Sequence, residues 1–93
     1  MGMEINIDRL MTNLFEMAKI GMNEQGGIDR ALGSRADYET RQWLLSYWER
    51  NFKIHPVVDP IANMWVKREG SEPLLPIVLG SHHDAVPDGG KYD

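Results

Sequence analysis

The run Ile77-Val78-Leu79 constrains the fold of this 93-residue chain more than any other feature. It is the most hydrophobic run in the sequence, and it follows Pro76 without alternating polar residues. Its β-branched content and unbroken hydrophobicity predict a strand that is buried on both faces. Such a strand is usually parallel and central, so we expect an α/β fold.

Two helices are expected before this strand. Apolar residues recur at spacings of three and four between residues 7 and 20, which is the period of a helix with one buried face. Asp8 is a candidate cap, and Gly21 is expected to end the helix. Residues 23–33 contain three glycines and predict a loop.

The second helix is predicted from its first residues. Ser34 is followed three positions later by Asp37, a variant of the capping box in which the usual partner is Glu or Gln. The helix is expected to run to about Arg50. A β-hairpin should follow, with strands over residues 52–58 and 64–67 joined by a turn at Asp59 and Pro60.

Composition narrows the classes of function. Ten Lys and Arg against fourteen Asp and Glu give a net charge of -4, and no basic run is present, so nucleic acid and membrane surfaces are not expected partners. The absence of cysteine excludes disulfides and thiolate metal sites, which leaves His and carboxylates as metal ligands. No apolar stretch approaches the roughly 20 residues of a membrane span, and residues 1–7 lack a signal-peptide pattern, so a cytoplasmic protein is expected.

A polar cluster follows the predicted buried strand. Ligand sites of open α/β sheets lie beyond the carboxyl ends of strands, where this chain has two histidines and three aspartates. If the strand continues through Asp84, its period of two places His82 and Asp84 on one face and His83 on the other. A turn over residues 87–90 would bring Asp93 back toward them.

The residues alone leave the role of this cluster open. A histidine near a strand end is more often hydrogen-bonded or exposed than a metal ligand, and His82 with its two aspartates brings the two interpretations to about even. His83 is expected to be structural, and His55 to be a surface residue. Asp88 is better explained as a turn former than as a ligand.

The segment from Gly80 to Asp93, written Gly-Ser-His-x-Asp-x-Val-Pro-x-Gly-Gly-x-x-Asp, resembles the first metal motif of the aminoacylase and carboxypeptidase-like zinc metallopeptidases. The resemblance is closest to the branch of N-carbamoyl-L-amino-acid hydrolases and allantoate amidohydrolases. It covers nearly the whole chain, including these upstream features: Gly26-Gly27-x-x-Arg30, Ser34 with Asp37 and Arg41, and Asn63 with Trp65-Val66-Lys67-Arg68.

This resemblance implies a fold and a chemistry. Residues 1–93 would form the N-terminal part of a three-layer α/β/α catalytic domain, with two helices, a hairpin and one buried strand. His82 would bind one metal ion and Asp93 would bridge two. Asp84 would act as a catalytic residue that orients the His82 ring without binding the metal itself. Two zinc ions, or manganese in some members, activate a water that attacks an amide or carbamoyl carbonyl. The expected substrates are small molecules such as N-carbamoyl-L-amino acids or allantoate, and the family is commonly homodimeric.

Two departures from the family pattern matter. Ala85 stands where the family usually has Thr or Ser, which should not abolish metal binding. The general-base Glu and the remaining metal ligands follow the first motif in this family, and the sequence stops at Asp93. The 93 residues alone are therefore expected to be inactive, since a catalytic zinc typically has three protein ligands and a water. Three interpretations stay open: the N-terminal segment of a hydrolase, a binding module without catalysis, or a weak metal binder.

Overall fold

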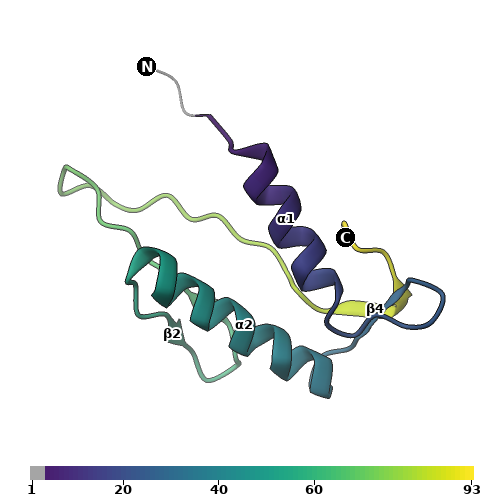
Figure 1. Cartoon of the computed structure of the whole chain (residues 1–93). Coiled ribbons are helices and arrows are strands. Elements are labelled where there is room, and N and C mark those ends of the chain that lie inside the picture. The colour runs from purple at the N-terminus through teal and green to yellow at the C-terminus, as the bar shows by residue number, and fades with distance from the viewer. Residues whose placement is uncertain (1–3) are drawn as a thin grey trace. The chain divides into compact units, whose positions relative to one another are not determined.

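The computed structural model describes residues 4–93, which form two compact units. The first unit comprises the chain up to Thr40 together with His83–Asp93, and the second comprises Arg41–His82. Figure 1 shows two helices and short strands, with a long stretch lacking regular structure ahead of β4. No helix among these residues is long and apolar enough to cross a lipid bilayer.

Helix α1, Ile7–Ala18, confirms the first predicted helix but not its cap. The cap is Asn6, whose side-chain oxygen accepts from the backbone N–H of Arg9 at 3.0 Å. Asp8 instead lies in the first turn, where its negative charge favours the positive end of the helix dipole. Gly21 follows the helix with a φ of 85°, and a Cβ there would lie 2.5 Å from the backbone oxygen of Asp29. Glycine is thus required by the close approach of two backbone segments.

The loop predicted over residues 23–33 contains a strand. Strand β1, Ile28–Arg30, pairs antiparallel with β4, Ala85–Gly89, so the turn predicted over residues 87–90 is wrong as well. The pairing joins Ile28 to Gly89 and Arg30 to Ala85, which leaves an irregularity in β4 between the two pairs. Asp88, with a φ of 57°, lies in this irregularity. A bulge leaves the extra residues of one strand out of the ladder and bends that strand.

The small core of the first unit lies where α1 meets these strands. Ala18, Ile28 and Ala85 are buried and form one cluster. Each comes from a different element, because α1, β1 and β4 supply one side chain each. The pairing of β1 with β4 therefore also fixes the end of α1.

Helix α2, Arg35–Phe52, begins as its capping pattern predicts. The Ser34 hydroxyl oxygen accepts from the backbone N–H of Asp37 at 3.1 Å. The Asp37 carboxylate reaches back to the N–H of Gly33 at 2.9 Å, one residue before the partner used in a standard capping box. The strand predicted from residue 52 is wrong in its first part, because α2 continues through Phe52.

The second unit contains the predicted hairpin, in shortened form. Strands β2, Val57–Val58, and β3, Met64–Trp65, pair antiparallel. The Asp59 carboxylate holds the turn: it accepts from the backbone N–H of Asn63 at 2.8 Å and from the Trp65 indole N–H at 3.0 Å. One side chain therefore links the start of the turn to its end and to β3.

Acid should open this hairpin. Hydrogen bonds from the side chains of Trp65 and Asn63 lower the pKa of Asp59 below its ordinary 3.8. Because the folded pKa is depressed, the stabilisation is present above pH 3.8 and is lost as the pH falls through the lower folded value. We expect the NMR resonance of the Trp65 indole N–H to move toward its unfolded position in that acid range. In Asp59→Asn the resonance should not follow this titration; an identical titration in both proteins would contradict the assignment.

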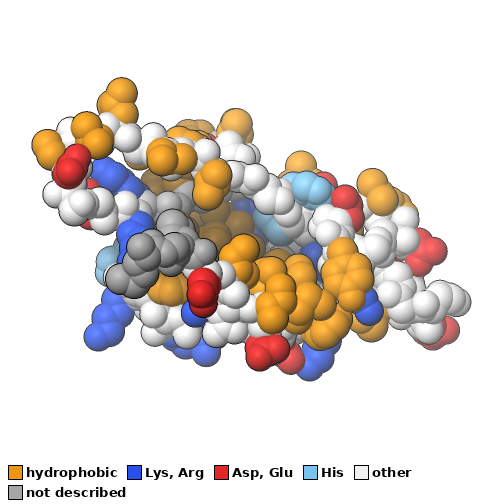
Figure 2. Space-filling view, turned by 90° about the horizontal axis from the view of Figure 1, so that it is seen from above, with side chains coloured by type: hydrophobic (Ala, Val, Ile, Leu, Met, Phe, Trp, Pro, Cys, Tyr) orange, Lys and Arg blue, Asp and Glu red, His pale blue; other side chains and the backbone are white. Residues whose placement is uncertain are grey.

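The predicted buried strand is not observed. Residues 77–79 lie in the irregular stretch before β4, and their exposed fractions are 90%, 67% and 92%. A strand needs a neighbour for its N–H and C=O groups, and no strand in the described part of the chain pairs with this segment. Figure 2 shows hydrophobic side chains spread over the visible surface, and Leu74 and Leu75 are among the exposed ones.

Candidate functional site

The predicted site residues are divided between the two units. His82 is the last residue of the second unit, and Asp84 and Asp93 belong to the first. Strand β4 begins only at Ala85, so the expectation of a strand running through Asp84, and the face assignment that depends on it, are wrong. His82 and Asp93 are exposed, and Asp84 is half-buried.

His82 and Asp93 carry donor groups of the kind that bind metal ions. An imidazole and carboxylates are ligands that zinc takes in proteins, so the chemistry of His82 and Asp93 fits. Their number does not complete a centre: within residues 4–93 no group of three His, Asp or Glu side chains is placed to hold an ion. These residues fit as part of a metal centre, not as a whole one.

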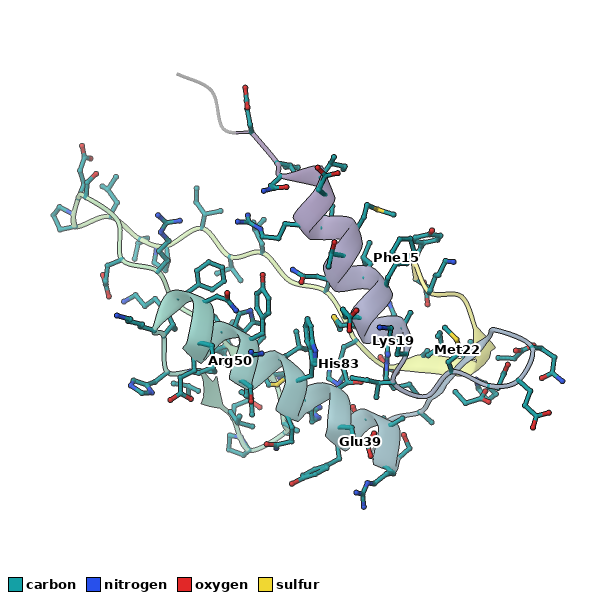
Figure 3. The ribbon with its side chains drawn as sticks, viewed as in Figure 1. Phe15, Lys19, Met22, Glu39, Arg50 and His83 are labelled. Carbon is teal, nitrogen blue, oxygen red and sulfur yellow. The ribbon has the colours of Figure 1, made fainter. Side chains whose placement is uncertain are left out.

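A buried polar network lies directly beside Asp84. The Arg30 guanidinium Nε donates to the backbone oxygen of His83 at 2.8 Å. The His83 Nε2 donates to Asp37 Oδ1 at 2.6 Å, because a carboxylate can only accept. His83, labelled in Figure 3, thus joins the segment before β4 to the first turn of α2. This contact agrees with the structural role predicted for His83.

Arg30 and Asp37 are the most buried charged groups of the network, with exposed fractions of 8% and 4%. Burial lowers the pKa of the Arg30 guanidinium, and the negative charges of Asp37 and Asp84 oppose that shift. A buried cation is costly unless it is paired and hydrogen-bonded. Here the guanidinium is hydrogen-bonded to three backbone oxygens, and the negative charges of Asp37 and Asp84 favour its charged form.

A second network fixes the other end of β4. The Asn23 side-chain amide donates to Asp88 Oδ1 at 2.8 Å and to Asp29 Oδ2 at 3.2 Å. The backbone N–H of Asp88 donates to Asp29 Oδ1 at 2.6 Å. A Cβ on Gly27 would lie 1.9 Å from Asp88 Oδ1, so a larger residue there would displace the Asp88 carboxylate. Asp88 therefore holds the backbone, which supports the prediction that it is not a ligand.

The residues after β4 contact α1. The Lys91 ammonium lies 5.2 Å from the centroid of the Phe15 ring, within the range of a cation–π interaction. It also lies 5.3 Å from the Tyr92 ring. Phe15 is labelled in Figure 3. The contact with Phe15 links the segment leading to Asp93 to α1.

Comparisons with known proteins identify relatives over almost the full chain. No family model matches the sequence. It is 41% identical over 90 residues to the N-carbamoyl-L-amino-acid amidohydrolase of Rhizobium meliloti, covering 96% of this chain and 21% of that protein. It is 28% identical over 92 residues to the allantoate amidohydrolase of Bacillus subtilis strain 168, covering 97% and 22%.

A solved structure shows the same fold. The crystal structure of a hydantoinase/carbamoylase family amidase from Burkholderia ambifaria matches with a TM-score of 0.84 and 34% identity, over 95% of this chain and 22% of that chain. This chain spans about a fifth of the length of each of these proteins.

Proposed function

Because this chain is homologous to the N-terminal fifth of the N-carbamoyl-L-amino-acid and allantoate amidohydrolases, we propose that it forms the first part of a metal-dependent hydrolase domain. The bonds cleaved would be linear carbamoyl or ureido amide bonds of small molecules. The observation that carries the proposal is the match to the Burkholderia ambifaria amidase, at 34% identity over 95% of this chain. Identity at that level, together with the shared fold, argues for a shared chemistry.

Each candidate residue has a task in this proposal. His82 supplies an imidazole nitrogen and Asp93 a carboxylate to the metal centre, and Asp84 accepts the second ring N–H of His82. Two divalent ions, zinc or manganese, supply an activated water and polarise the carbonyl when bound. Since two donors cannot hold a dinuclear centre, we expect the 93 residues alone to be inactive.

The test is a substrate panel on the polypeptide as its host produces it. N-carbamoyl-L-amino acids and allantoate should be hydrolysed with release of ammonia. N-acetyl-L-amino acids, which carry an amide but no ureido group, should be poor substrates. Equal hydrolysis of the acetyl and carbamoyl compounds would remove the ureido assignment while leaving an amide hydrolase.

One observation favours an alternative. Residues 74–79 present apolar side chains to solvent, and exposed apolar patches often mark interaction sites. A chain of 93 residues that acts alone could use this segment to bind a partner without catalysis. In that case metal would not change the protein's behaviour, whereas replacing Leu75 and Leu79 with serine would abolish partner binding.

Asp84→Asn tests the supporting role of that carboxylate. The amide keeps the shape but can present an N–H to His82 and so favours the wrong tautomer. We expect metal affinity to fall by about 10- to 100-fold, measured by calorimetric titration with Zn²⁺. Asp88→Asn is the matched control, because its side-chain oxygen can still accept from Asn23. Equal affinities of Asp84→Asn and wild type would exclude this role.

A further inference from the structure

We propose that Arg30 is a positioning residue for Asp84, a role that rests on the proposed function. Arg30 would hold the backbone on both sides of Asp84 and so set the direction of its carboxylate. Neither the pattern of the sequence nor the chemistry of metal ligands assigns this task to an arginine in β1. The inference comes from the contacts that Arg30 makes.

Arg30 engages both neighbours of Asp84. Its backbone lies opposite Ala85 in the pairing of β1 with β4. Its guanidinium Nε donates to the backbone oxygen of His83 at 2.8 Å. Residues 83 and 85 are thus both held by one residue, which leaves the backbone at Asp84 little freedom to rotate.

The same guanidinium is anchored to α1. Its Nη1 donates to the backbone oxygens of Met17 at 2.8 Å and of Ile20 at 3.1 Å, at the C-terminal end of that helix. All three acceptors of Arg30 are carbonyl oxygens of the backbone. Arg30 therefore links the His83 carbonyl to the C-terminal end of α1.

Only arginine has the shape for this set of contacts. The planar guanidinium presents several N–H donors in a fixed fork, whereas the lysine ammonium is a compact charge on a flexible stem. Asp37 strengthens the arrangement, because its carboxylate binds the His83 ring at 2.6 Å and its charge favours the Arg30 cation. Loss of the fork should release the backbone before Asp84 even when the positive charge is kept.

The experiment compares Arg30→Lys and Arg30→Ala with wild type, in the polypeptide as its host produces it. The readouts are Zn²⁺ affinity by calorimetry and hydrogen exchange of the Asp84 and Ala85 amides. We expect both variants to bind Zn²⁺ at least about 10-fold more weakly, which is the effect typical of losing a group that orients a metal ligand. Hydrogen exchange at these two amides should be faster than in wild type. Guanidinium ion, added below denaturing concentrations, should restore affinity to Arg30→Ala and leave wild type unchanged. Arg35→Ala is the control, because its side chain is 85% exposed and pairs only with Glu39 among the contacts observed.

The outcomes separate the two proposals. If wild type binds no Zn²⁺, the proposed function fails and the role of Arg30 fails with it. If wild type binds Zn²⁺ and Arg30→Lys binds it equally tightly, the positioning role alone is overturned. Should Arg30→Ala be unfolded, Arg30→Lys decides the question, since it keeps the charge and most of the side-chain volume.

Discussion

Replacing His82 with alanine is expected to remove one bound metal ion and to reduce hydrolysis more than 100-fold, in the polypeptide as its host produces it. Loss of a group that hydrogen-bonds to a metal ligand lowers metal affinity or activity by about 10- to 100-fold, so loss of the ligand itself should lower them further. Metal analysis of the purified variant should give one ion for every two in wild type. Ammonia release from N-carbamoyl-L-amino acids measures the loss of activity.

His83→Ala is the matched control for this result. Its ring binds Asp37 at 2.6 Å and is 16% exposed, so the substitution removes a buried hydrogen bond rather than a metal ligand. We expect a loss of about 1–3 kcal/mol in the free energy of unfolding, with the metal content and most of the activity retained. Equal losses of metal in the two variants would show that the ligand has been assigned to the wrong histidine.

Asp37→Ala is expected to destabilise the fold more than any other single change to a charged residue considered for this chain. The carboxylate caps α2 through Gly33, binds the His83 ring and compensates the buried Arg30 cation. Removing one partner from a buried charged group strongly destabilises a protein, because the other charge is left uncompensated. We expect a loss of about 3–5 kcal/mol, measured as a shift of the urea unfolding midpoint.

Two further variants set limits on this loss of stability. Asp37→Asn keeps the side-chain oxygen that accepts from Gly33 but removes the charge, so its loss should be smaller. Glu39→Ala, two residues further along α2, breaks an exposed pair with Arg35 and should change stability by less than about 0.5 kcal/mol. If Asp37→Ala and Glu39→Ala shift the midpoint equally, the buried network does not stabilise the fold.

The helices and the hairpin were predictable because their signals are local. The three- and four-residue spacing marks α1, the Ser34 and Asp37 pattern marks the start of α2, and Asp59 marks the turn between β2 and β3. The pairing of β1 with β4 was not predictable, since its two strands are more than fifty residues apart and β4 contains a proline. Strand propensity reflects packing against neighbours, which a single sequence does not display.

The prediction that residues 77–79 form a buried strand was wrong because the segment lacks a partner strand among residues 4–93. The sequence pattern correctly marks a segment that is suited to burial between neighbours. The described residues provide no pairing strand, so the segment is exposed instead. Hydrophobic pattern indicates which environment a segment suits, while the observed environment depends on which partners are present.

The candidate site, too, could be predicted only in part from the sequence. His82, Asp84 and Asp93 were identified from their residue types and spacing, and their roles stay predictions. Arg30 was noticed only as part of a pattern shared with a family, and its contacts depend on pairings across the chain. Arg30 lies on the same face of β1 as the buried Ile28, but residues 23–33 were predicted to be a loop, so the sequence did not indicate that its side chain is buried.

The most direct test of the central claim is the rate of ammonia release from an N-carbamoyl-L-amino acid, before and after removal of metal from the polypeptide isolated from its host. The proposed function predicts hydrolysis that disappears with a chelator and returns when Zn²⁺ or Mn²⁺ is added. Absence of hydrolysis in the metal-loaded protein, or hydrolysis that is unaffected by the chelator, would contradict it.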